Sequence, residues 1–196
     1  MTVSTMLSLL SEGFVTSLLI FVLTLLFSMP LGLAVMFGRR SRLTPLRGFI
    51  KAYISIMRGT PLMLQLIVVY FAPYYIFRIR ISSGYRMIAV IIGFVLNYAA
   101  YFAEIYRSGI QSIPVGQYEA AKILGYSKGQ TFFKIILPQV IRNILPSVSN
   151  EFVINIKDTS VLNVIGVTEL YYFAGVIKRQ NFQTFQTYLV VCVIYF

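Results

Sequence analysis

Four polar side chains interrupt the apolar stretch from residue 145 to 167, recurring at steps of four, four and three: Ser147, Glu151, Asn155 and Asp158. On an α-helix this spacing places them on one stripe, because residues three or four apart share a face. A carboxylate in apolar surroundings must find a positive partner or take up a proton. The stripe could therefore bind a cation, and we expect it to face a cavity or another chain rather than lipid.

The stretch from residue 87 to 105 leads into a second stripe of this kind, formed by Asn97, Tyr101, Glu104 and Ser108. Two interpretations are open for both stripes. They could line a path for a polar solute, or they could be polar contacts that hold helices together, with local pairs such as Glu104 with Arg107. We prefer the path for Glu151 and Asn97.

A third candidate is Arg58-Gly59-Thr60-Pro61, which interrupts the long apolar run from residue 49 to 77. Thr60 is a suitable N-cap and Pro61 a suitable first helical residue, so we predict a helix break with a new helix starting at Pro61. The exposed N–H groups and the positive dipole end of such a helix suit a carboxylate. Gln65 could assist, although the segment could equally be a simple kink.

The composition is that of an integral membrane protein. Hydrophobic residues make up 58% of the 196-residue chain and charged residues only 12%, with a mean hydropathy of +0.78. Soluble domains carry about twice that charge. The absence of histidine and the single cysteine remove most options for a catalytic nucleophile-base pair or a metal site, so we expect neither an enzyme nor a metalloprotein. The net charge of +11 fits anchoring at a membrane surface, not nucleic-acid binding.

The apolar runs predict an all-α, polytopic fold with five transmembrane helices in a single domain, residues 1–196. We expect crossings at 14–37, 49–77 with its break, 87–105 and 145–167. The last apolar run, 185–196, has only 12 residues, too few to cross, so we expect that span to continue beyond residue 196.

Lysine and arginine set the predicted orientation. Eleven of them lie in the loops after the first and third spans, and five lie on the opposite side. Basic loops stay in the cytoplasm. The sequence therefore predicts an outside N-terminus in a plasma membrane and both longer loops in the cytoplasm.

The second of these loops, residues 108–145, has the pattern of a folded platform. Pro114 can open a helix and Gly125 can close it in a left-handed conformation, while Ser127-Lys128-Gly129-Gln130 fits a capping box. Pro138 and Pro146 are predicted to break the path back into the membrane. The alternative is an amphipathic loop on the lipid surface.

The platform carries Glu119-Ala120-Ala121 and then Gly125, followed by Ile135-Ile136-Leu137-Pro138. This resembles the E-A-A-x3-G-x9-I-x-L-P signature of permeases in ATP-binding-cassette importers. The segments 58–62, 101–114 and 157–170 resemble the polar amino-acid branch of that family. The resemblance covers nearly the whole chain. It departs from the family only at the end, where the last span is incomplete and the usual basic tail is absent.

The resemblance implies an importer permease fold with a cytoplasmic coupling helix at Glu119, Ala120, Ala121 and Gly125. It also implies two ATPase subunits that bind the ATP, a second permease copy or homologue, and an extracytoplasmic solute-binding protein. In this interpretation Asp158, in the family's K-D-T-S stretch, fits gating or packing as well as a substrate path.

The leading hypothesis is thus a prokaryotic amino-acid importer subunit that works by alternating access. The expected substrates are polar or basic amino acids, and Glu151 favours basic ones such as arginine, lysine or histidine. The chain itself lacks a phosphate-binding G-x-x-x-x-G-K-[ST] loop and needs no cofactor of its own. The alternative is an ATP-independent channel or carrier for a small polar solute or ion, which would have no need of the platform.

Overall fold

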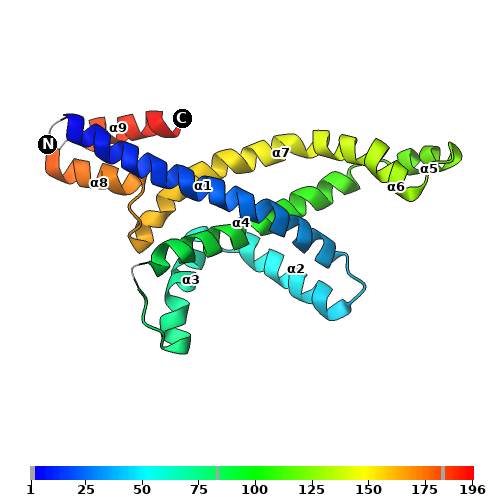
Figure 1. Ribbon diagram of the computed structural model, residues 1–196, viewed down its shortest axis with the longest axis horizontal. Coiled ribbons are helices and arrows are strands. Elements are labelled where there is room, and N and C mark those ends of the chain that lie inside the picture. The colour runs from blue at the N-terminus through cyan, green and yellow to red at the C-terminus, as the bar shows by residue number, and fades with distance from the viewer. Residues whose placement is uncertain (1–2, 83, 182–183) are drawn as a thin grey trace.

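The computed structural model describes residues 3–82, 84–181 and 184–196, and in these ranges the chain is helical without β-strands, as predicted (Figure 1). The elements in chain order are α1 Val3–Arg39, α2 Thr44–Gly59, α3 Leu62–Phe77, α4 Tyr85–Gln111, α5 Val115–Ile123, α6 Lys128–Gln130, the π-helix η1 Thr131–Ile136, α7 Leu137–Asp158, the 3-10 helix η2 Thr159–Ile165, α8 Leu170–Asn181 and α9 Thr184–Tyr195.

The helix α1 packs along α4, and small residues on α1 let the two backbones approach closely. A Cβ atom added at Gly32 would lie 2.7 Å from Cβ of Phe102 and 3.0 Å from the carbonyl oxygen of Ala99. Ser28 and Thr24, one and two turns earlier, are fully buried. This close packing fixes the position of α4, which carries one of the two predicted polar stripes.

Two helices, α1 and α4, are each long and apolar enough to cross a membrane. They contain the predicted spans 14–37 and 87–105. Two bent helix pairs pass the same test together and could each be a broken span or a re-entrant loop: α2 with α3, at 116°, and the segment Lys128–Ile165 with α8, at 58°. The last predicted run corresponds to α9, a shorter apolar helix. The structure thus offers up to four crossings by length and composition, and the number five stays a prediction.

The predicted break between α2 and α3 is confirmed, but its capping is wrong. The helix α3 begins at Leu62, with Pro61 at its N-cap position, and Thr60 is the C-cap of α2. The hydroxyl of Thr60 donates to the carbonyl oxygen of Ile56 at 2.8 Å, and its N–H donates to the same oxygen at 3.1 Å. Thr60 therefore completes the earlier helix, because its hydroxyl finds a nearer acceptor there.

The predicted breaks at Pro138 and Pro146 are also wrong, since Pro138 lies in the first turn of α7 and Pro146 lies inside that helix. The π-helix η1 comes immediately before, and the N–H of Leu137 bonds the carbonyl oxygen of Phe132, five residues earlier. Such widened turns re-pair the backbone where the regular ladder is disturbed. The predicted span 145–167 is consequently the later part of a longer helical segment, and α8, which follows it, was not predicted.

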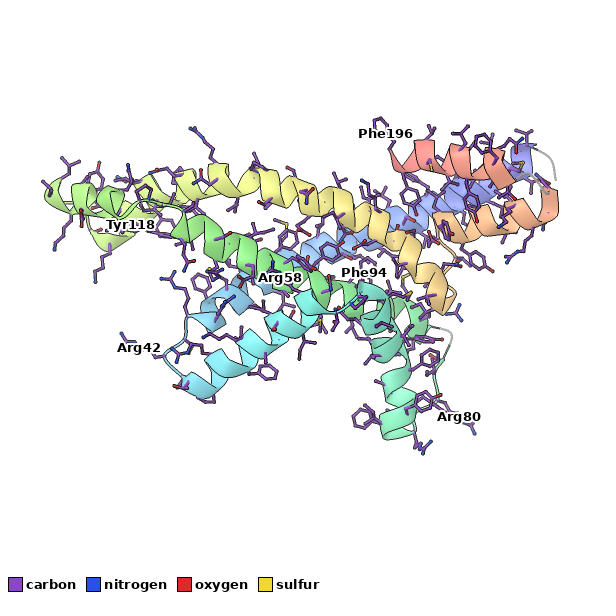
Figure 2. The ribbon with its side chains drawn as sticks, turned by 180° about the vertical axis from the view of Figure 1, so that it is seen from behind. Arg42, Arg58, Arg80, Phe94, Tyr118 and Phe196 are labelled. Carbon is purple, nitrogen blue, oxygen red and sulfur yellow. The ribbon has the colours of Figure 1, made fainter. Side chains whose placement is uncertain are left out.

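The two predicted basic loops lie on the same side of the molecule. Figure 2 shows Arg42, in the turn after α1, on the same side as Tyr118 of α5, whereas Arg80 and Phe196 lie on the other side. The small helices α5 and α6 form one end of the molecule, far from α8 and α9 (Figure 1). The predicted orientation, which places both basic loops in the cytoplasm, is compatible with this arrangement.

Candidate functional site

Two side-chain amides hold the break between α2 and α3. The Nε2 atom of Gln65 lies 2.8 Å from Oγ1 of Thr60 and 3.0 Å from the carbonyl oxygens of both Thr60 and Met57. The Nδ2 atom of Asn97, on α4, donates to Oε1 of Gln65 at 2.8 Å and to the carbonyl oxygen of Met57 at 3.2 Å. The last carbonyls of a helix lack partners within it. Gln65 and Asn97 supply those partners and tie the break to α4.

A cavity of about 140 Å³ lies beside this break. Its walls come from the end of α2, the first turn of α3, and the helices α4 and α7. We call it the carboxylate cavity, and its lining residues are Thr60, Leu62, Asn97, Tyr98, Tyr101, Glu151, Ile154 and Asp158. The structure thus brings together five of the residues that were predicted for a substrate path: Thr60, Asn97, Tyr101, Glu151 and Asp158.

The two carboxylates of the cavity differ in their partners. Asp158 accepts a hydrogen bond of 2.7 Å from the hydroxyl group of Tyr98. Glu151 is half-buried and forms no hydrogen bond or ion pair with any residue in the ranges that the structure describes. The cavity therefore contains one carboxylate that is available to a cation, next to a second that is already hydrogen-bonded.

Arg58 lies behind the wall of the cavity and is not among its lining residues. Its guanidinium carbon is 5.4 Å from the ring centroid of Tyr101, which is within the range of a cation–π contact. One guanidinium nitrogen is 3.9 Å from Oε2 of Glu104. Arg58, predicted as a path residue, thus connects the cavity wall to a group of charges outside the cavity.

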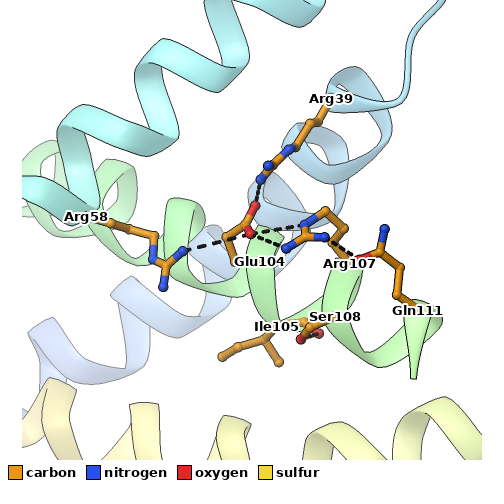
Figure 3. A network of polar contacts seen from close by, with 7 residues as sticks. All are labelled: Arg39, Arg58, Glu104, Ile105, Arg107, Ser108 and Gln111. Carbon is orange, nitrogen blue, oxygen red and sulfur yellow. Dashed lines mark hydrogen bonds and ion pairs between the residues drawn. The ribbon is translucent and has the colours of Figure 1, made fainter. Parts of the chain in front are cut away.

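That group, which we call the Glu104 cluster, consists of Glu104, Arg39, Arg58 and Arg107 (Figure 3). Oε2 of Glu104 accepts from Nε of Arg107 at 3.0 Å and from its Nη2 at 2.8 Å, and Oε1 pairs with Arg39. The Glu104–Arg107 pair that the sequence suggested as a structural contact is therefore present. The cluster joins the ends of α1 and α2 to α4.

Asn155 does not line the cavity, although it belongs to the predicted stripe. It is completely buried, and neither polar atom of its side chain has a hydrogen-bond partner among the described residues. A step of seven residues returns to nearly the same angle on a helix, whereas a step of four passes it by about 40°. Glu151 and Asp158 therefore lie nearly in line on the helix, whereas Asn155 is offset from Glu151 by about 40° and is not among the lining residues.

Sequence reasoning missed the role of Glu169, which is completely buried. Its carboxylate accepts from the N–H groups of Tyr171 and Tyr172 at 2.6 and 2.7 Å, and from the hydroxyl of Tyr195 at 3.3 Å. It thereby caps the first turn of α8 and ties it to α9. An acidic residue directly before a helix is favourable at the positive end of the helix dipole, and this signal could have predicted α8.

The turn chemistry of the platform is as predicted. Gly125 has a φ of 79°, its N–H bonds the carbonyl oxygen of Lys122, and the N–H of Tyr126 bonds that of Ala121. These two bonds form a Schellman motif, in which a left-handed residue ends a helix. The capping box of Ser127 and Gln130 is also present. The platform is therefore a folded unit and not a connecting loop.

The platform leaves large apolar side chains exposed to solvent. Val115, Ile123, Leu124 and Phe133 are between 67% and 86% exposed. Among the predicted coupling residues, Glu119 and Ala120 are exposed and Ala121 is buried. Exposed apolar groups on a folded unit are typical of a surface that binds another protein or a membrane.

Comparisons with known proteins identify the family. Residues 28–196 match the family described as "Binding-protein-dependent transport system inner membrane component". The chain belongs to this family. It is 35% identical over 185 residues to a putative glutamine transport system permease protein of Rickettsia conorii, covering 94% of this chain and 84% of that protein. It is 41% identical to a probable amino-acid ABC transporter permease protein of Bacillus subtilis, covering 94% of this chain and 80% of that protein.

A solved structure agrees with this assignment. A crystal structure described as an amino acid ABC transporter with histidines superposes with a TM-score of 0.87 at 32% sequence identity, over all of this chain and 92% of that one. This permease thus has the importer permease fold. Its relatives are permease subunits of ATP-binding-cassette transporters, which are membrane transport components and not enzymes.

Proposed function

We propose that this permease carries amino acids, with a preference for basic ones such as arginine, lysine and histidine, into a prokaryotic cell by alternating access. The observation that carries the proposal is the carboxylate cavity at the break between α2 and α3. An amino acid has a carboxylate and an ammonium group, and a basic one has a second cation. The cavity offers a complementary group for each charge.

The first turn of α3 suits the carboxylate of the substrate. Leu62, the first residue of α3, and Thr60 before it both line the cavity. The first N–H groups of a helix have no partner within it and lie at the positive end of its dipole. Broken helices use such ends to bind anionic substrate groups in transporters.

Glu151 suits a cationic group of the substrate, because it lines the cavity and forms no ion pair with any described residue. An arriving guanidinium or ammonium would pair with it and offset the cost of an uncompensated carboxylate in the membrane. The solved relative that is described with histidines gives independent support for a basic substrate. The cavity, about 140 Å³, is small beside pockets for drug-sized ligands, which suits a single amino acid.

The proposed partners follow from the family and the platform. Two cytoplasmic ATPase subunits would bind ATP and receive the apolar side chains that the platform exposes around Ile123 and Leu124. A second permease copy or homologue would complete the solute path around a two-fold axis. A solute-binding protein would deliver the amino acid at the side of the N-terminus, which we place outside the cell.

Coupling through the platform can be tested with a matched pair of glycine variants. A Cβ atom added at Gly125 or at Gly116 would have no neighbouring atom within 4 Å, but only Gly125 of the two has a positive φ. Gly125→Val should therefore distort the turn after α5, by about 1–2 kcal/mol of strain, while Gly116→Val should keep it. Both would be co-expressed with their ATPase and measured for ATP hydrolysis and amino-acid uptake in vesicles.

We expect Gly125→Val, and also Glu119→Lys, to lose the ATPase or to hydrolyse ATP without uptake, whereas Gly116→Val transports normally. Normal, ATP-driven uptake by an assembled Gly125→Val complex would contradict the coupling role. Uptake by the permease alone, without ATP, would favour a channel or carrier instead. Crosslinking that finds only one permease chain in an active complex would contradict the paired arrangement.

A further inference from the structure

A strongly basic hollow lies at the end of α1, between α2 and α4, and none of the transport steps uses it. We call it the basic pocket. It has a volume of about 360 Å³, and its lining residues are Arg39, Arg40, Arg47, Lys51, Arg107, Ile110 and Gln111. A neighbouring hollow of about 390 Å³ shares Arg39 and Lys51 with it. Five cations thus line one pocket that has no acidic lining residue.

We propose that the basic pocket binds the phosphate headgroup of an anionic phospholipid. Acidic side chains of the protein neutralise only part of the positive charge that lines the pocket. Glu104 pairs with Arg39 and Arg107. The other three cations, Arg40, Arg47 and Lys51, have no ion pair with any acidic residue in the described ranges. The nearby carboxylate of Glu104 therefore neutralises only part of the charge of the five cations, and a phosphate group would supply the missing negative charge.

The side chains of α2 favour a lipid over a free phosphate ion as the ligand of the basic pocket. Arg47 and Lys51 lie one turn apart on α2, and apolar side chains of the same segment, Leu46, Phe49 and Ile56, are 40–73% exposed. A helix with a basic face and exposed apolar side chains is suited to the boundary between headgroups and acyl chains. The pocket thus offers cations for a headgroup beside apolar side chains for its acyl chains.

A lipid at this position would act on the transport site through α2. The basic pocket includes residues from the first turns of α2, and α2 ends at Gly59, next to Arg58 and the break beside the carboxylate cavity. A bound headgroup would hold α2 against α1 and α4, and Arg39 and Arg107 would belong to both the Glu104 cluster and the lipid site. This inference does not depend on which solute the permease carries.

The test measures lipid binding by the purified complex of permease and ATPase. Delipidated complex would be titrated with short-chain phosphatidylglycerol or phosphatidylcholine, and bound lipid counted by native mass spectrometry. Arg47→Gln/Lys51→Gln removes two pocket cations and leaves the Glu104 cluster intact. Arg78→Gln/Arg80→Gln is the matched control, because it removes two arginines from the segment between α3 and α4.

We expect wild type to prefer phosphatidylglycerol, and the pocket variant to bind it about 25-fold more weakly, at about fivefold for each cation. The control should bind as wild type does. Equal binding of both lipids by wild type, or unchanged binding by the pocket variant, would overturn the proposal. Displacement of phosphatidylglycerol by an equal concentration of inorganic phosphate would show that the pocket takes free phosphate, which also contradicts a lipid site.

Discussion

Two regions of this permease contain buried or half-buried carboxylates, and they differ in how the negative charge is compensated. In the Glu104 cluster one carboxylate is shared by three arginines from α1, α2 and α4. In the carboxylate cavity two carboxylates, Glu151 and Asp158, receive only the hydroxyl group of Tyr98. The two regions are close, because Arg58 contacts both Glu104 and Tyr101 of the cavity wall.

The difference separates a structural use of charge from a functional one. A carboxylate surrounded by cations is stabilised in place and joins the helices that carry those cations. A carboxylate without a cation in an apolar setting remains costly until a cation arrives. The Glu104 cluster should therefore contribute to stability, and the carboxylate cavity to substrate binding.

The largest effect is expected for Glu104→Gln. It leaves three neighbouring arginines without their anion and should destabilise the folded permease by about 3 kcal/mol. Loss of helicity would be followed by circular dichroism during unfolding of the purified complex. Glu12→Gln is the control, because Glu12 is exposed and its side chain has no ion pair in the described ranges. Equal stabilities of the two variants would contradict a structural role for the Glu104 cluster.

A smaller effect is expected for Asn97→Leu, since Asn97 lines the carboxylate cavity. The variant leaves Gln65 Oε1 without its donor, at a cost of about 1–3 kcal/mol, whereas the carbonyl oxygen of Met57 keeps its bond from Nε2 of Gln65. It should also widen the break and weaken substrate binding. Asn143→Leu is a suitable control, because Asn143 donates to Ser112 at an exposed site. If uptake shows an unchanged KM for Asn97→Leu, the amide pair does not shape the site.

The smallest effect on stability is expected for Glu151→Gln. No described residue pairs with this carboxylate, so its neutralisation should change the unfolding free energy by less than about 0.5 kcal/mol or raise it. The same unfolding experiment measures it beside Glu104→Gln. A loss as large as that of Glu104→Gln would mean that both regions use their charge in the same way.

Local chemistry made part of this structure predictable. The left-handed turn at Gly125 and the Ser127–Gln130 capping box could be predicted from residue types at fixed offsets, and the structure confirms both. The helix break near Pro61 could also be predicted from residue types, but the predicted N-cap role of Thr60 is wrong. The break expected at Pro146 is absent because α7 continues through this proline, which helices of membrane proteins tolerate.

Contacts between elements distant in sequence could not be predicted. The sequence placed Gln65 and Asn97 in the path, but their bonds to each other and to Met57 depend on how α3 and α4 pack. Periodicity grouped Asn155 with Glu151, and only the orientation of α7 separates them. The three arginines around Glu104 come from three helices, and only Arg107 lies on the same helix as Glu104. Sequence spacing could therefore identify only Arg107 as its partner.

The most direct test of the central claim is the substrate preference of wild type and Glu151→Gln in reconstituted vesicles. ATP-driven uptake of arginine, lysine, histidine and glutamine would be measured with the complete complex. We predict that wild type prefers the cationic substrates and that Glu151→Gln lowers kcat/KM for arginine and lysine about 10- to 100-fold while glutamine changes little. An equal decrease for all four substrates, or uptake of glutamine alone by wild type, would contradict this account.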